Sequence, residues 1–220
     1  ELIMNTRNSV IPAIRNLVIT ILFMTTVYPV CVASHTSYLL SKKDTRLIAK
    51  EWIENNIEKE TKIIVDLGHV KLRSTKDALI EQKKISNGYL TAKERTILNS
   101  NINLNEYLKY PKYHALNIDT NFTPKEFVSV DAAGDVKLIE YIKENDYKYI
   151  VIKYRSDNYK SDWQKKINEV AGQPLIVFRP SVSHDLPPYL HSTVIIDKPV
   201  YSLFNVERFG PTVAIYKINN

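Results

Sequence analysis

The side chains that could do chemistry are few and lie far apart in this sequence. The densest group is Ser183, His184 and Asp185, with His191 in the same proline-containing stretch. Three consecutive residues cannot form a catalytic triad, because a nucleophile, a base and an orienting acid need a geometry that neighbours in sequence do not provide. The two histidines also lack the close spacing of known zinc motifs. We therefore predict no catalytic residue and no metal ligand here.

A second group is expected where strands of a predicted sheet end. Asp66 ends the apolar segment KIIVD, His69 follows it, and Arg155 follows the segment KYIVIK. In open α/β sheets, ligands bind outside the carboxyl ends of the strands. These side chains could line one rim and serve a small soluble enzyme. The sequence favours the simpler interpretation, a solvated strand end.

Cofactors and nucleic acids have no recognisable signal in the chain. The segment after KIIVD reads LGHVKLRS, whose one glycine does not make the glycine-rich turn that holds a dinucleotide phosphate. Cys31 is the only cysteine, which excludes disulfides and cysteine-based zinc sites from the rest of the chain. The net charge is +6, but beyond residue 43 there are 26 basic and 23 acidic residues without a concentrated basic patch. We expect no cofactor, no metal and no nucleic-acid partner.

Tyrosine is unusually frequent, with 14 residues. Aromatic rings stack on sugars and also suit the membrane interface. Packing within strands and on the surface is the favoured interpretation, and a face toward sugars or lipid headgroups is the alternative. The two groups are Tyr107, Tyr110 and Tyr113, and Tyr147, Tyr149, Tyr154 and Tyr159.

One stretch determines where these residues are placed in the cell. Asn16 to Ser41 contains no Lys, Arg, Asp or Glu over 26 residues. This length suffices for a membrane-spanning helix, although a signal peptide with Arg7 and Arg15 before it is an alternative, and a buried core helix is a third. The first two both export the domain that follows. The chain starts at Glu1, so we expect a processed or excised piece of a protein.

The charges around this stretch argue against export of the following domain. Lys42, Lys43, Arg46 and Lys50 follow it, whereas Arg7 and Arg15 precede it. The positive-inside rule would place the following domain in the cytoplasm, but long domains translocate largely regardless of charge. We therefore predict residues 1–41 as a membrane helix with its flanks, and residues 42–220 as an extracytoplasmic domain.

Helical periodicity alternates with short apolar runs after the membrane segment. Such alternation is typical of an α/β sandwich, and we predict a small Rossmann-like domain with a mainly parallel sheet. Residues 111–134 are expected to be a long polar connection. The predicted helices cover residues 44–57, 76–84, 91–110, 135–145 and 161–170, and the predicted strands cover 62–66, 148–153, 174–178, 193–197 and 212–218.

Four features occur in a recognisable order: an uncharged membrane run, the phrase DTRLIAKEWIENNIEKETKIIVD, the phrase DYKYIVIKYR with a helix and PLIVF after it, and the ending FGPTVAIYKI. This order resembles the C-terminal extracytoplasmic domain of GT-C class membrane glycosyltransferases, of the dolichyl-phosphate-mannose–protein mannosyltransferase-like group. The closing phrase of that family matches Gly210, Pro211, Ile215, Tyr216, Lys217 and Ile218.

The resemblance implies a transferase that uses a polyprenyl-phosphate-linked sugar. Its catalytic carboxylates would lie in an upstream membrane domain of the same protein, so no catalytic residue is assigned to this chain. The implied partners are membrane lipid, the lipid-linked sugar and that upstream domain. A free-standing exported or singly anchored binding domain without catalysis is the alternative hypothesis.

Overall fold

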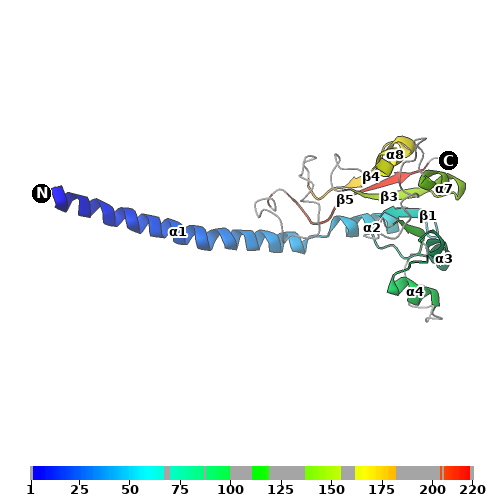
Figure 1. The fold of residues 1–220 in the computed structure, drawn as a ribbon, viewed down its shortest axis with the longest axis horizontal. Helices are drawn as coiled ribbons and strands as arrows, with labels where there is room; N and C mark the ends of the chain where they lie inside the picture. The colour runs from blue at the N-terminus through cyan, green and yellow to red at the C-terminus, as the bar shows by residue number, and fades with distance from the viewer. Residues whose placement is uncertain are drawn as a thin grey trace.

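The computed structural model describes residues 2–66, 70–86, 88–99, 111–118, 137–154, 162–181, 204 and 206–218. One long helix, α1 (Leu2–Ser41), projects from an α/β domain (Figure 1). The other helices are α2 (Thr45–Asn56), α3 (Lys76–Ile85), α4 (Ala92–Asn99), α7 (Lys137–Glu144) and α8 (Asp162–Ala171). The strands are β1 (Lys62–Asp66), β2 (His114–Ile118), β3 (Tyr149–Tyr154), β4 (Ile176–Phe178) and β5 (Thr212–Lys217).

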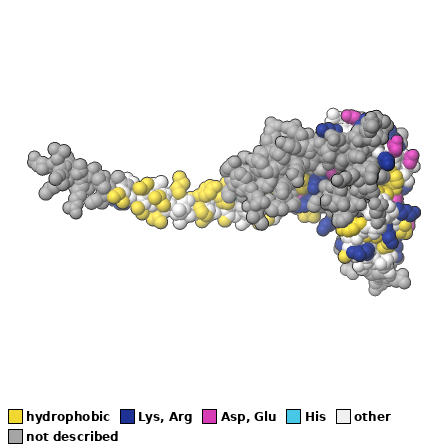
Figure 2. Space-filling model, viewed as in Figure 1, with side chains coloured by type: hydrophobic (Ala, Val, Ile, Leu, Met, Phe, Trp, Pro, Cys, Tyr) yellow, Lys and Arg dark blue, Asp and Glu magenta, His cyan; other side chains and the backbone are white. Residues whose placement is uncertain are grey.

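Helix α1 carries its apolar side chains without a protein cover. Every side chain from Ile14 to Cys31 is exposed, and α1 is the one described helix that is long and apolar enough to cross a membrane. Figure 2 shows these apolar side chains along the rod. A helix that is apolar on all sides suits a lipid surround rather than one face of a soluble core. This finding fits a membrane anchor or a signal sequence.

Three threonine hydroxyls of α1 are satisfied within the helix itself. The hydroxyls of Thr20, Thr26 and Thr36 each donate to the backbone carbonyl four residues earlier, at 2.6–2.9 Å. Such bonds let threonine enter hydrocarbon without an unsatisfied donor. Pro29 lies inside the helix, where its ring leaves the carbonyl of residue 25 without the usual N–H donor.

The last turns of α1 differ from the rest because one face is covered. Val32, His35 and Thr36 are half-buried and Leu39 is fully buried. These positions recur at the spacing of a single helical face. The protein therefore buries side chains of α1 only at the end of the helix that meets the domain.

Three residues separate α1 from α2, and the first turn of α2 is well defined. Asp44 caps the helix, because its carboxylate accepts from the backbone N–H of Arg46 at 2.8 Å. The guanidinium of Arg46 also donates to Asp44 through Nε at 2.7 Å. The buried face of α2 holds Ala49 and Ile53, as helical periodicity predicts.

The five strands form one mixed sheet in the order β2-β1-β3-β5-β4. The α/β class is confirmed, but the expectation of a mainly parallel sheet is only partly right. β1 pairs in parallel with β2 and β3, whereas β5 pairs antiparallel with β3 and β4. β5 is buried on both faces except at its last residue, so it fits between two strands.

Helices cover both faces of the sheet, which gives three layers (Figure 1). On one face, Ala49, Ile53 and Ile57 of α2 pack against a cluster that includes Ile63, Val65, Val151, Val213 and Ile215. On the other face, α7 and α8 pack against a cluster that includes Ile64, Ile150, Ile152, Ala214 and Tyr216. The alternation of these residues between faces follows from the two-residue repeat of a strand.

The outer edge of β2 corrects the prediction that residues 111–134 form a polar connection. Residues 114–118 of that stretch are a strand, whose polar members hid its alternation. The side chain of Gln82 bonds both backbone groups of Asn117, with Nε2 donating to the carbonyl at 2.5 Å and Oε1 accepting from the N–H at 2.6 Å. The hydroxyl of Ser74 donates to the carbonyl of Ala115 at 3.1 Å. These contacts close an edge that would otherwise pair with another chain.

Candidate functional site

The start of α2, directly after α1, is held by a contact between two segments that are distant in sequence. The backbone N–H of Thr45 donates to the carbonyl of Phe209 at 3.0 Å, and its hydroxyl donates to the carbonyl of Pro211 at 2.7 Å. Thr45 is fully buried. The phrase DTR at the start of α2 and the phrase FGP before β5 therefore form one unit, which we call the junction clamp (residues 44–46 and 209–211).

Gly210 is the residue that allows this close approach. Its φ of +114° is a backbone conformation that other residues rarely adopt. A Cβ atom at this position would lie 2.0 Å from the Thr45 hydroxyl oxygen and 2.6 Å from Asp44 Oδ1. Both the backbone angle and the available space therefore require glycine.

The junction clamp places the start of β5 beside the start of α2, next to the end of α1. Thr212, directly after the clamp, pairs with Tyr154 at the carboxyl end of β3, and Val213 pairs with Phe178 at the end of β4. β1 runs parallel to β3, so Asp66 ends at the same side. The carboxyl ends of β1, β3 and β4 thus face the end of the domain from which α1 projects, toward the membrane if α1 spans it.

The strand order also makes this edge of the sheet a candidate position for ligand binding. The chain moves from β1 outward to β2 and then back across β1 to β3, so the direction of winding reverses between β1 and β3. In doubly wound sheets, ligands bind at such a reversal, outside the carboxyl ends of the strands. Asp66 lies there, buried, and its Oδ2 accepts from the backbone N–H of Lys153 at 3.3 Å. The carboxylate thereby ties the ends of β1 and β3 together.

Asp66 is the member of the predicted rim whose position is known. His69 and Arg155 lie outside the described residues, as do Ser183, His184, Asp185 and His191. Within the described part of the chain, no group of three His, Cys, Asp or Glu side chains could hold a metal ion. The structure thus brings no catalytic set together at this edge among the residues that it describes.

The cations after α1 are largely neutralised by nearby acids. Lys43 Nζ lies 2.7 Å from Glu51, Lys50 Nζ lies 3.7 Å from Glu54, and the Arg46 guanidinium pairs with Asp44. Lys42 lies over the ring of Tyr38, with Nζ 4.5 Å from the ring centroid. The basic flank noted in the sequence is therefore a set of local pairs rather than an open positive patch.

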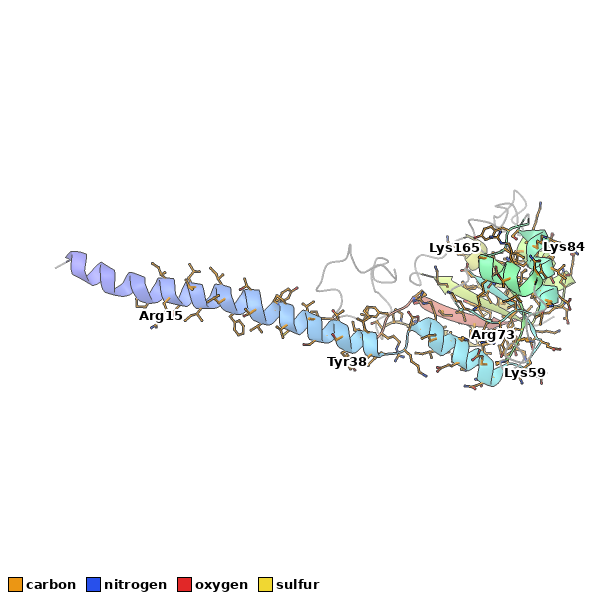
Figure 3. All side chains as sticks on the ribbon, turned by 90° about the horizontal axis from the view of Figure 1, so that it is seen from below. Arg15, Tyr38, Lys59, Arg73, Lys84 and Lys165 are labelled. Atoms are coloured by element: carbon orange, nitrogen blue, oxygen red, sulfur yellow. The ribbon has the colours of Figure 1, made fainter. Side chains whose placement is uncertain are left out.

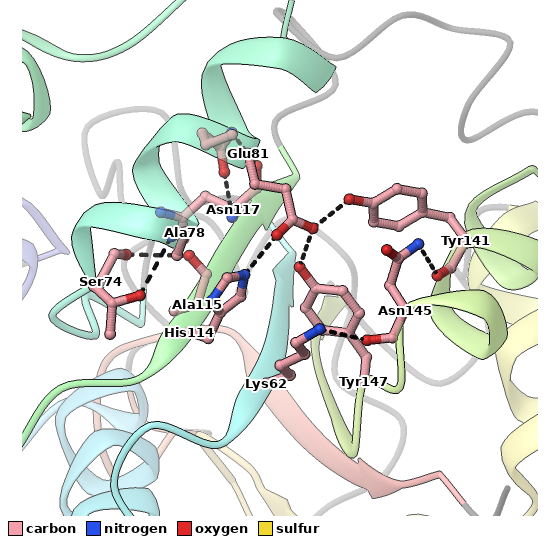
Figure 4. A network of polar contacts seen from close by, with 12 residues as sticks. Lys62, Ser74, Ala78, Glu81, His114, Ala115, Asn117, Tyr141, Asn145 and Tyr147 are labelled. Atoms are coloured by element: carbon pink, nitrogen blue, oxygen red, sulfur yellow. Dashed lines mark hydrogen bonds and ion pairs between the residues drawn. The ribbon is translucent and has the colours of Figure 1, made fainter.

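A polar network occupies the opposite end of the sheet, at the start of β2 and β3 (Figure 4). The Glu81 carboxylate of α3 lies 2.6 Å from His114 Nε2 and accepts from the Tyr147 hydroxyl, also at 2.6 Å. It accepts from the Tyr141 hydroxyl of α7 as well. Lys62 Nζ donates to the carbonyl of Asn145 at 2.8 Å beside the same ring of Tyr147. We call Glu81, His114, Tyr141 and Tyr147 the distal network.

Burial and hydrogen bonding compete in the distal network. Burial alone would raise the pKa of Glu81, but the bonds from Tyr141, Tyr147 and His114 together hold that pKa below its usual value. Burial, followed by the bond to Glu81, raises the pKa of both Tyr141 and Tyr147 well above the ordinary tyrosine range. The carboxylate is therefore charged and both tyrosines are neutral donors at neutral pH.

This arrangement suits a structural role. Glu81 has three partners on three different elements, so it joins α3 to β2, to α7 and to the segment before β3. The sequence analysis favoured packing for Tyr147, and Tyr147 is buried. Glu81 itself carried no sequence signal, because its partners lie 33 to 66 residues away.

Comparison with known proteins adds no relative. No family model, no curated protein and no solved structure matches the chain.

The junction clamp predicts a specific cost for a methyl group at residue 210. Gly172 also has a positive φ, but a Cβ there would meet nothing within 4 Å. Gly172→Ala should lower the free energy of unfolding by about 1–2 kcal/mol, through backbone strain alone. Gly210→Ala should cost more than about 3 kcal/mol, because the methyl also collides with Thr45. Urea unfolding of the full chain in detergent, followed by tryptophan fluorescence, measures both, and equal losses would contradict the clamp.

The distal network predicts a pH-dependent cost for Glu81→Gln. The folded-state pKa of Glu81 is lowered, so its stabilisation is complete above the unfolded-state pKa and is lost as pH falls through the folded-state value. At neutral pH the substitution should lower the free energy of unfolding by about 1–3 kcal/mol, and in acid the difference should shrink. Glu58→Gln, on an exposed side chain, is the matched control. A loss that is independent of pH would rule out this charge effect.

Proposed function

We propose that the chain is the membrane-anchored, non-catalytic C-terminal part of an integral-membrane glycosyltransferase that uses a polyprenyl-phosphate-linked sugar donor. The observation that carries the proposal is the junction clamp. The two phrases with the most specific resemblance, DTR and FGP, lie more than 160 residues apart and bond directly to each other. The two phrases therefore have a shared physical reason, because together they join the start of α2, next to the membrane helix of our proposal, to the start of the last strand.

The direction of the sheet supports the same proposal. The edge at which α/β domains usually bind ligands faces the end that carries α1. A donor with a polyprenyl chain would stay in the bilayer and present its phosphate and sugar at this level. In our proposal, the domain lies beside such a donor and beside an upstream membrane domain, which would supply the catalytic carboxylates.

The reading frame before Glu1 provides the most direct test of this proposal. We expect the gene to continue upstream through several further apolar segments, with a pair of acidic residues in the first loop outside the cytoplasm. Translation that starts at Met4 would contradict the proposal. It would favour the alternative hypothesis, a singly anchored binding domain without catalysis.

We further propose that the domain lies outside the cytoplasm. Long domains translocate largely regardless of the charges that flank them, so the basic residues after α1 do not oppose this location. Alkaline phosphatase fused after Asn220 should be active in bacterial cells, because this enzyme folds only after export, and green fluorescent protein at the same site should stay dark. A bright fluorescent fusion with inactive phosphatase would place the domain in the cytoplasm instead.

A further inference from the structure

Four side chains at the end of α1 form a continuous stack. Phe204 lies face to face with His35, with ring centroids 4.7 Å apart. The ring centroids of His35 and Tyr38 are 6.3 Å apart. Lys42 lies over the ring of Tyr38, with Nζ 4.5 Å from the ring centroid. We call these four residues the ring stack. Three belong to α1 and its end, whereas Phe204 comes from a part of the domain more than 160 residues later.

The ring stack combines apolar faces with polar tips. Phe204 is 48% exposed and Tyr38 is 54% exposed, although both are large aromatic side chains. In water, such exposure leaves apolar surface without cover. At the boundary of a bilayer the same groups are favourable, because tyrosine and lysine place an apolar body toward the hydrocarbon and a polar end toward the headgroups.

The charges of α1 place the ring stack at that boundary. Arg15 and Lys42 enclose the 26 uncharged residues, which extend for about 39 Å at 1.5 Å per residue. A bilayer with its headgroups is about 40–45 Å thick. With Arg15 in one headgroup layer, Lys42 falls in the other, and His35 with Phe204 falls about 10 Å deeper, at the edge of the hydrocarbon.

We infer that the domain rests on the bilayer and that Phe204 inserts into the phospholipid headgroup layer beside α1. The inference depends on the proposed function only in requiring that α1 spans the membrane. The lipid surface is the occupant because the ring stack continues directly from the lipid-facing part of α1, where every side chain from Ile14 to Cys31 is exposed. The contact adds a second attachment point, which limits tilting of the domain and keeps the carboxyl edge of its sheet toward the bilayer.

Fluorescence quenching in vesicles tests this contact with the full chain. In a Cys31→Ser background, bimane is attached at Phe204→Cys and, as a matched control, at Lys59→Cys beyond the far end of α2, where Figure 3 shows Lys59. Phospholipids with a spin label on the headgroup should quench the label at residue 204 about twofold or more strongly than the label at residue 59. Equal quenching at the two positions would overturn the inference.

Two further measurements separate a failure of the membrane span from a failure of the Phe204 contact. Bimane on the natural Cys31 should be quenched by phospholipids with a spin label in the middle of the acyl chain. Quenching at Cys31 without quenching at residue 204 would support α1 as a membrane span and contradict the contact of Phe204 with lipid. No quenching at Cys31 would contradict both the membrane span and the contact. Phe204→Trp retains a ring against His35, so its added emission should be quenched by lipids brominated near the headgroup, and the absence of quenching would also contradict the contact.

Discussion

The junction clamp is the contact on which the arrangement of this molecule depends. One threonine supplies two hydrogen bonds, from its N–H and its hydroxyl, to carbonyls on either side of Gly210. These bonds bring the start of the first domain helix against the start of the last strand, across most of the length of the chain. Because β5 lies between β3 and β4, its position sets the direction of the sheet relative to the start of α2, which directly follows α1.

The two ends of the sheet therefore have different surroundings. The end toward α1 carries the carboxyl ends of β1, β3 and β4 and the buried Asp66, and lies close to the ring stack. The far end carries the distal network, in which Glu81 joins α3, β2 and the residues around Tyr147. A charged carboxylate with three donors stabilises this far end of the domain. The proposed contact with lipid or a lipid-linked sugar lies at the other end.

Local patterns predicted most of the elements correctly. The helix from Thr45 with its Asp44 cap and the strands KIIVD and TVAIYK could be predicted because periodicity and capping are local properties. β2 was missed, since His114 and Asn117 interrupt its apolar pattern and its outer edge is closed by Gln82, a contact that no local signal reveals. The antiparallel direction of β5 and the distal network also depend on pairings between distant residues. The sequence placed Asp66 at a strand end but favoured a solvated position, which is wrong: Asp66 is buried and accepts from the backbone of β3, a pairing that no local signal reveals.

The central claim is that α1 remains on the mature protein and crosses the bilayer. The reactivity of Cys31, the only cysteine of the chain, measures this directly in native membranes. A maleimide that cannot enter the bilayer should leave Cys31 unmodified in intact membranes and modify it after detergent is added, on a protein whose mass still includes residues before Ala33. A mature protein that begins after Ala33 and has no thiol, or a thiol that reacts equally without detergent, would contradict the account.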